Sequence, residues 1–164
     1  MQIRWFTPTL EVELCGHATL ATARILFDEY FQNESKISFQ SKSGELVALH
    51  KDDMFNLDFP IDHPTVIESE PLISESLKCE PVGILKGRSD YLAIMASEKE
   101  IKNLQPDFST MAKLNSRGLV VSAESSEADF ISRCFYPQTG VDEDPVTGSA
   151  HCMLAAYWSK KLNL

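Results

Sequence analysis

The sequence has little positive charge and no cluster of it. Its 164 residues include 15 lysines and arginines against 24 aspartates and glutamates, which gives a formal net charge of -9. Nucleic acids and anionic membrane surfaces are bound by basic patches. The composition therefore argues against both as partners. An anionic substrate would need local help, which unpaired N–H groups at helix ends could supply.

Long apolar runs and paired cysteines are also missing. Charged residues interrupt every apolar stretch well before the roughly 18 residues that a membrane span needs. The first residues contain no apolar targeting segment. No C-x-x-C spacing links the four cysteines, which are Cys15, Cys79, Cys134 and Cys152. We therefore expect free thiols in a reducing, cytoplasmic location and no membrane partner.

The chain does contain enough apolar residues to fold. It is 43% hydrophobic and 24% charged, which suits one good core or two small cores of roughly 80 residues each. Two prolines, Pro60 and Pro64, stand in a stretch without periodicity and predict a linker. We accordingly expect residues 1–62 to form the remainder of an N-terminal half and residues 63–164 most of a C-terminal half.

Alternating apolar and polar residues predict short strands, and apolar runs behind glycines predict two helices. The helices begin near Gly16 and Gly148 and have almost no polar face, so we expect burial on most sides. Ser97 is predicted to cap a short helical segment, and Asp107 or Ser109 to begin a further turn. The pattern is weak between residues 65 and 81. The predicted strands cover residues 37–39, 44–50, 54–59, 82–86, 91–96, 119–123 and 130–136.

The chain also contains a degenerate internal repeat. The pattern Arg4-x-Phe6-x-Pro8, then Cys15-Gly16-His17-Ala18, is similar to Arg133-x-Phe135-x-Pro137, then Thr147-Gly148-Ser149-Ala150. Each copy leads into an apolar helix whose first N–H groups lack helical partners. Two equivalent halves related by a pseudo-twofold axis would bring both helix starts to one cleft. Such a cleft suits a carboxylate substrate.

Three segments resemble the signature segments of the PhzF-like (phenazine biosynthesis-like) isomerase family. They are RWFTP at 4–8, ELCGHATLATA at 13–23 and GVDEDPVTGSAH at 140–151. The family's fold is similar to that of diaminopimelate epimerase. The resemblance implies an α+β fold of two pseudo-symmetric halves, each a curved, mostly antiparallel sheet around a central helix. It also implies a homodimeric, cofactor-independent isomerase or epimerase that moves a proton at carbon in a small carboxylic acid.

The same resemblance assigns roles by position. His17, Asp144 and Ser149 match the family's active-site residues, and Gly16 and Gly148 match the glycines whose neighbouring amides hold the substrate carboxylate. Thr147 also joins the predicted substrate-binding set. His17 and Asp144 would handle protons, while Ser149 and the amides would bind oxygen.

Family members carry a further acid/base glutamate upstream of the RWFTP segment and further strands after the second helix. Neither has a counterpart here, so the chain resembles the middle of a family member, truncated at both ends. Without that glutamate the chain would keep the carboxylate site but lack the principal acid/base.

Simpler interpretations of the same residues remain open. Cys15 could be a small buried residue or a catalytic thiol. Asp144 and Ser149 could merely cap a helix start, and Glu143 could be a solvated loop acid. The Cys15-x-His17 order lacks the usual zinc-ligand spacing, so we expect no metal and disfavour a metal-dependent hydrolase. The main alternative is a non-catalytic relic or a small-molecule or partner-binding protein on the same scaffold.

Overall fold

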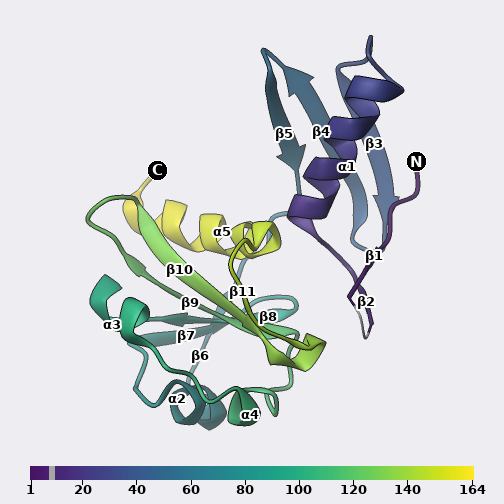
Figure 1. Cartoon of the computed structure of the whole chain (residues 1–164). Helices are drawn as coiled ribbons and strands as arrows, with labels where there is room; N and C mark the ends of the chain where they lie inside the picture. Colours follow the sequence, from purple (N-terminus) through teal and green to yellow (C-terminus); the bar gives the residue numbers. More distant parts are fainter. Residues whose placement is uncertain (8–9) are drawn as a thin grey trace. The chain divides into compact units, whose positions relative to one another are not determined.

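The computed structural model describes residues 1–7 and 10–164 and divides the chain into two units (Figure 1). Unit 1 consists of Met1–Ile61 and Val146–Cys152, and unit 2 consists of Asp62–Pro145 and Met153–Leu164. The segment 146–152 thus belongs to the first unit although it follows most of the second along the chain. The division of the chain into halves at residue 62 stays a prediction.

The described residues of unit 1 include two small antiparallel sheets and the helix α1. The first sheet pairs β1 (Trp5–Phe6) with β2 (Glu11–Val12). The second sheet has the order β3-β4-β5. Asp52 and Asp53 turn the chain between its last two strands with positive φ angles of 51° and 59°, a conformation that aspartate tolerates. The remaining elements are α1 (Gly16–Glu29), β3 (Lys36–Ser41), β4 (Gly44–Lys51) and β5 (Met54–Asp58).

The helix α1 lies along one face of the β3-β4-β5 sheet (Figure 1). Ala23 and Phe27 on this side of the helix are 0% and 3% exposed, whereas Leu20 and Ile25 are 40% and 57% exposed. The buried stripe is therefore narrower than the sequence predicted, because the described sheet covers only one side of the helix. The buried core of unit 1 consists of Trp5, Ala23, Phe27, Ile37, Phe39, Leu46 and Ala48.

Unit 2 is built on a six-stranded sheet with the order β11-β10-β9-β8-β7-β6. All neighbouring pairs are antiparallel except β8 and β9. The sequence missed the two edge strands, β6 and β11. The strands are β6 (Thr65–Ile67), β7 (Gly83–Lys86), β8 (Asp90–Ile94), β9 (Gly118–Glu124), β10 (Phe130–Tyr136) and β11 (Val141–Asp144).

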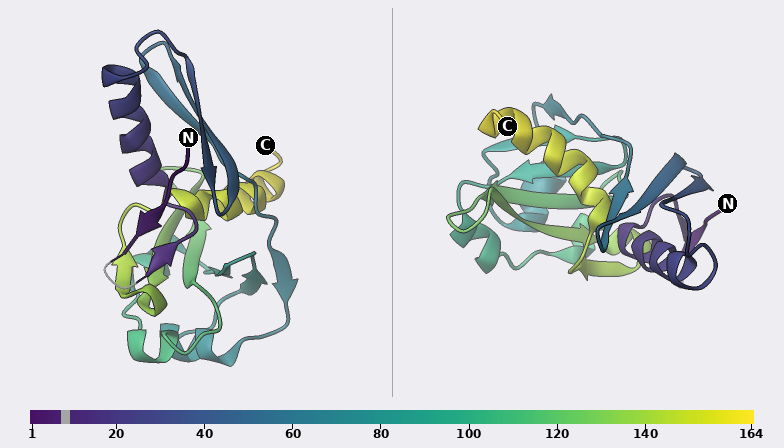
Figure 2. Two further views of the ribbon diagram at one scale, coloured as in Figure 1. Left: turned by 90° about the vertical axis from the view of Figure 1, so that its right-hand side faces the viewer. Right: turned by 90° about the horizontal axis from the view of Figure 1, so that it is seen from above.

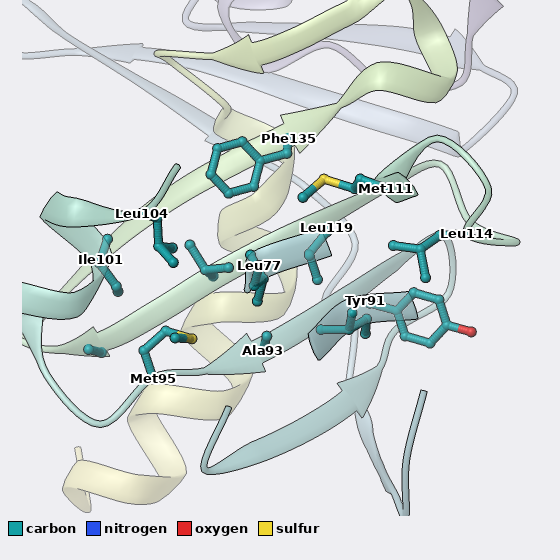
Figure 3. Packing of buried hydrophobic residues seen from close by; sticks show 13 residues of the cluster. Leu77, Tyr91, Ala93, Met95, Ile101, Leu104, Met111, Leu114, Leu119 and Phe135 are labelled. Carbon is teal, nitrogen blue, oxygen red and sulfur yellow. The ribbon is translucent and has the colours of Figure 1, made fainter. Parts of the chain in front are cut away.

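Short helices cover one face of this sheet. They are α2 (Pro71–Leu77), α3 (Glu98–Asn103) and α4 (Phe108–Met111). Their apolar residues pack on alternate residues of β8, β9 and β10, including Tyr91, Leu119 and Phe135 (Figure 3). The predicted caps are confirmed, since the side chains of Ser97 and Asp107 accept hydrogen bonds from the first turns of α3 and α4.

The helix α5 (His151–Leu162) runs across the other face of the sheet (Figure 2). Trp158, 2% exposed, stacks on Phe130 and donates its indole N–H to Ser122 Oγ at 2.9 Å. Ser122 is fully buried and donates in turn to the carbonyl of Ile131 at 2.8 Å. A buried polar chain thus fixes α5 on β9 and β10, because breaking it would leave buried donors unpaired.

The α+β fold class is confirmed. Both copies of the repeat fold in the same order, as an antiparallel strand pair followed by a helix: β1, β2 and α1 in one copy, β10, β11 and α5 in the other. Residues 141–144, for which the sequence predicted no strand, form the edge strand β11. Three of these four residues are acids, which are depleted in strands, so strand propensity does not predict β11.

Candidate functional site

Two glycines of unit 1 come into direct backbone contact. Gly16 begins α1, and Gly148 begins the 3-10 turn η2 (Gly148–Ala150) that leads into α5. A Cβ atom placed on Gly16 would lie 3.0 Å from Gly148 Cα, and one placed on Gly148 would lie 3.1 Å from Gly16 Cα. Only residues without a side chain permit this approach. The structure therefore brings together the two helix starts that the repeat predicted to face each other.

The N-cap residues of the two helix starts make no capping bond with their own side chains. Cys15 and Thr147 occupy the N-cap positions of α1 and η2, and neither makes a side-chain capping bond to any residue in the described part of the chain. The first turns of both contain no acid. Helix N-termini present N–H groups with partial positive charge, so the paired starts favour an anion. Ser149 is the second residue of η2 and not its N-cap, so the capping interpretation of this serine was wrong.

His17 connects the first helix start to the segment that leads to the second. Its Nδ1 lies 3.2 Å from the carbonyl oxygen of Val146. Cys15 Sγ lies 3.5 Å from His17 Nε2 and 3.9 Å from Nδ1. A carbonyl oxygen can only accept, so Nδ1 of His17 is the donor in this contact.

Asp144 belongs to unit 2, where it is the last residue of β11. It lies opposite Cys134 of β10 and is half-buried. Its neighbour Glu143 accepts two hydrogen bonds from the Arg133 guanidinium, Nε to Oε1 at 2.7 Å and Nη2 to Oε2 at 2.8 Å. These hydrogen bonds lower the pKa of Glu143. Glu143 is thus an exposed acid, as expected, but it lies in the strand β11 and not in a loop, and it binds Arg133 of the neighbouring strand.

A second arginine–glutamate pair occupies the equivalent place in unit 1, and sequence reasoning missed it. Arg4 donates from Nε and Nη2 to the two carboxylate oxygens of Glu11, at 2.9 and 3.0 Å. Hydrogen bonds from Arg4 and then from Lys42 lower the pKa of Glu11 to about 2. A signal was present, because Glu11 and Glu143 each precede the glycine of their own copy by the same spacing.

Unit 2 also contains an open groove of about 900 Å³ between β6 and α2. None of the predicted site residues lines this groove. Its lining includes four acids, which are Glu68, Glu70, Glu75 and Glu80. Like charges repel a carboxylate ligand, so this groove does not compete with the helix starts as a carboxylate site. Across residues 1–7 and 10–164, no group of three or more His, Cys, Asp or Glu side chains is placed to hold a metal ion, and no helix has the length and apolarity for a membrane span.

The chain is similar to proteins of one known family along its whole length. The model of the phenazine biosynthesis-like protein family matches residues 1–164. The chain is 44% identical over 162 residues to an uncharacterised isomerase of Pseudomonas aeruginosa, covering 99% of this chain and 62% of that protein. It is 35% identical to the human phenazine biosynthesis-like domain-containing protein, covering 98% of this chain and 62% of the human protein.

Solved structures of phenazine biosynthesis proteins superpose on this chain. A PhzF-family phenazine biosynthesis protein of Enterococcus faecalis superposes with a TM-score of 0.87 at 40% identity, covering 99% of this chain and 62% of that one. A Clostridium difficile protein described as a putative phenazine biosynthesis PhzC/PhzF protein superposes with a TM-score of 0.86 at 38% identity, with the same coverage. The chain thus spans about three fifths of the length of these relatives.

Proposed function

Since the chain belongs to the phenazine biosynthesis-like family, we propose that it provides the scaffold of a cofactor-independent isomerase or epimerase acting on a small carboxylic acid. The observation that carries this proposal is the close backbone contact between Gly16 and Gly148 at the two helix starts. A carboxylate bound there would accept hydrogen bonds from first-turn N–H groups of both helices.

The proposed chemistry is a proton shift at a carbon beside the carboxylate. Removing that proton places negative charge on the carboxylate oxygens in an enolate-like intermediate, and the same N–H donors would stabilise it. His17 and Asp144 are the proposed proton carriers. Ser149 and Thr147 are proposed to bind substrate oxygen. These roles rest on the family resemblance and on the place of each residue in its element.

Solvent deuterium incorporation tests the proposal. The full chain is incubated in D₂O with a panel of small carboxylic acids, and exchange at the carbon next to the carboxylate is followed by NMR. We expect exchange that Asp144→Asn and His17→Gln each reduce by at least about tenfold, the usual size of a lost acid/base contribution.

Asp142→Asn is the matched control, because Asp142 is an exposed acid of the same strand β11, and it should exchange like the unmodified chain. Amide shifts of Gly16 and Gly148 on titration with the same acids report binding separately. Binding without exchange would refute the isomerase role and favour the alternative of a binding protein.

The proposal extends to a cytoplasmic homodimer with neither a nucleic-acid nor a membrane partner, as the family resemblance and the net charge of -9 suggest. Light scattering coupled to size-exclusion chromatography tests the assembly. A mass near twice 18.4 kDa is expected, and a mass of one chain at all concentrations would refute the dimer.

A further inference from the structure

The strand β11 carries Asp144, yet its own residues do not specify its register on β10. It consists of one valine followed by three acids, and it lies at the edge of the six-stranded sheet. Strand register is normally set by apolar residues that must face the core. If β11 slipped so that Glu143 lay opposite Cys134, an acid would still remain opposite Phe135.

The pairing of β11 with β10 is also irregular. Phe135 lies opposite Glu143, but the next residue, Tyr136, lies opposite Val141, so Asp142 has no partner on β10. This is a β-bulge, in which one strand carries an extra residue. Moving the bulge by one residue along β11 would turn a different acid to each face of the sheet. The register of β11 therefore needs a further interaction to specify it.

Arg133 of β10 supplies such an interaction. Its guanidinium donates from Nε and Nη2 to the two carboxylate oxygens of Glu143, at 2.7 and 2.8 Å. Its Nη1 donates to the carbonyl oxygens of Ile101 and Leu104 at the C-terminal end of α3, each at 3.0 Å. A guanidinium is planar and presents its donors in a rigid fork. These four bonds therefore fix its orientation, and with it the one place where it accepts a carboxylate.

The consequence for Asp144 follows from the alternation of side chains along a strand. Arg133 holds Glu143 on the face of the sheet that α3 covers, so Asp144 points to the other face, where it lies opposite Cys134. We propose that Arg133 is a positioning residue, which selects the register of β11 and thereby places Asp144. The relevance of this register to catalysis rests on the proposed role of Asp144 in proton transfer.

Arg133→Lys tests the proposal, because lysine keeps the positive charge but has no fork. Backbone NOEs between β10 and β11 in the isotope-labelled full chain show which residue lies opposite Cys134. In the unmodified chain this residue should be Asp144. In Arg133→Lys we expect these NOEs to be lost or to be joined by NOEs from Cys134 to Glu143. Asp142→Asn is the matched control, because Asp142 is an exposed acid of the same strand without a partner on β10, and it should keep the register.

Solvent deuterium exchange provides a second measurement on the same variants. Arg133→Lys should lower the exchange rate at saturating carboxylic acid by at least about tenfold, because a small misplacement of a proton carrier is costly. The acid concentration at half-maximal exchange should stay the same, since the carboxylate is proposed to bind the N–H groups of the helix starts. A structural defect that merely loosened the whole chain would change both quantities.

Glu143→Gln keeps the proposal testable if Arg133→Lys does not fold, because it leaves the bonds from Arg133 to α3 in place, and it should show the same loss of register. Either variant, folded and with its NOEs between Cys134 and Asp144 intact, would overturn the proposal. A lost register with an unchanged exchange rate would overturn the positioning role. If the unmodified chain exchanges no acid, the proposed function fails, and the NOEs still decide whether Arg133 selects the register.

Discussion

The two copies of the repeat have the same framework and different chemistry. In both, an arginine binds a glutamate of the neighbouring strand through two hydrogen bonds, Arg4 with Glu11 and Arg133 with Glu143. The strand registers also correspond, because Trp5 pairs with Val12 as Cys134 pairs with Asp144. In each copy, the same ion pair and the same strand register therefore position the backbone that leads into the helix.

The side chains at the helix starts differ between the copies. Where the second copy has Asp144, the first has Val12, and where the first has Cys15 and His17, the second has Thr147 and Ser149. The glycines, and the alanines Ala18 and Ala150, are the same in both. The shared framework therefore places the backbone of both helix starts, while the side chains at the two starts differ.

The two arginine–glutamate pairs also differ in burial. The Arg4 side chain is 54% exposed and that of Arg133 is 24% exposed. Arg133 additionally donates to the carbonyl oxygens of Ile101 and Leu104, each at 3.0 Å, at the C-terminal end of α3. Arg133 is therefore integrated into its unit, whereas the Arg4 side chain is mostly exposed and Glu11, at 16% exposure, is the more buried member of its pair.

The largest predicted effect concerns the glycine contact that the copies share. Gly148→Ala would place Cβ 3.1 Å from Gly16 Cα, against backbone that has little room to move. We expect a loss of about 1–3 kcal/mol in the free energy of unfolding, the usual cost of overpacking, and weaker carboxylate binding. Urea denaturation measures the first effect and amide titration the second.

Gly83→Ala is the control for this substitution, because a Cβ on Gly83 meets no atom within 4 Å. It should unfold at the same urea concentration as the unmodified chain or slightly above it. A Gly148→Ala variant with the stability and the carboxylate affinity of Gly83→Ala would show that the two helix starts do not need their close approach.

An intermediate effect should separate the two arginines. Arg133→Ala removes the partner of Glu143 and leaves two carbonyl oxygens near α3 without their donor. We expect a loss of about 1–3 kcal/mol in the free energy of unfolding. Arg4→Ala should cost clearly less, since exposed ion pairs contribute little to stability. Equal urea midpoints for the two variants would contradict the prediction that Arg133 contributes more to stability than Arg4.

The smallest effect is a pH dependence carried by Glu11. Its pKa in the folded chain is lowered to about 2 from a usual value near 4.5. A lowered folded pKa stabilises the protein above the unfolded value, and this contribution is lost as the pH falls toward the folded value. Glu11→Gln should therefore be slightly less stable than the unmodified chain at pH 6, and the difference should shrink between about pH 4.5 and 2.

Thermal unfolding across this pH range checks the prediction, and raising the ionic strength should reduce the difference at pH 6. Glu13→Gln is the comparison variant, because Glu13 is an exposed acid beside the same strand. A pH-independent difference between Glu11→Gln and the unmodified chain would indicate that Glu11 does not act through its charge.

Much of the fold could be predicted from the sequence. Strands with clear alternation, such as β4 and β10, and the capped starts at Ser97 and Asp107 are local features, and they appear where they were expected. The short edge strands β6 and β11 were missed because few residues define them and one is rich in acids. Their strand conformation depends on pairing with neighbours that the local sequence does not show.

The sequence by itself determined the repeat, the two helix starts and the residue types that stand at each of them. Only the tertiary structure decided that Gly16 and Gly148 touch, that the segment 146–152 joins the first unit, and that Glu11 and Glu143 bind arginines. The physical reason is the range of the interactions. Helix capping and strand alternation act between residues a few positions apart, whereas a backbone contact joining residues 16 and 148 exists only after long segments have packed.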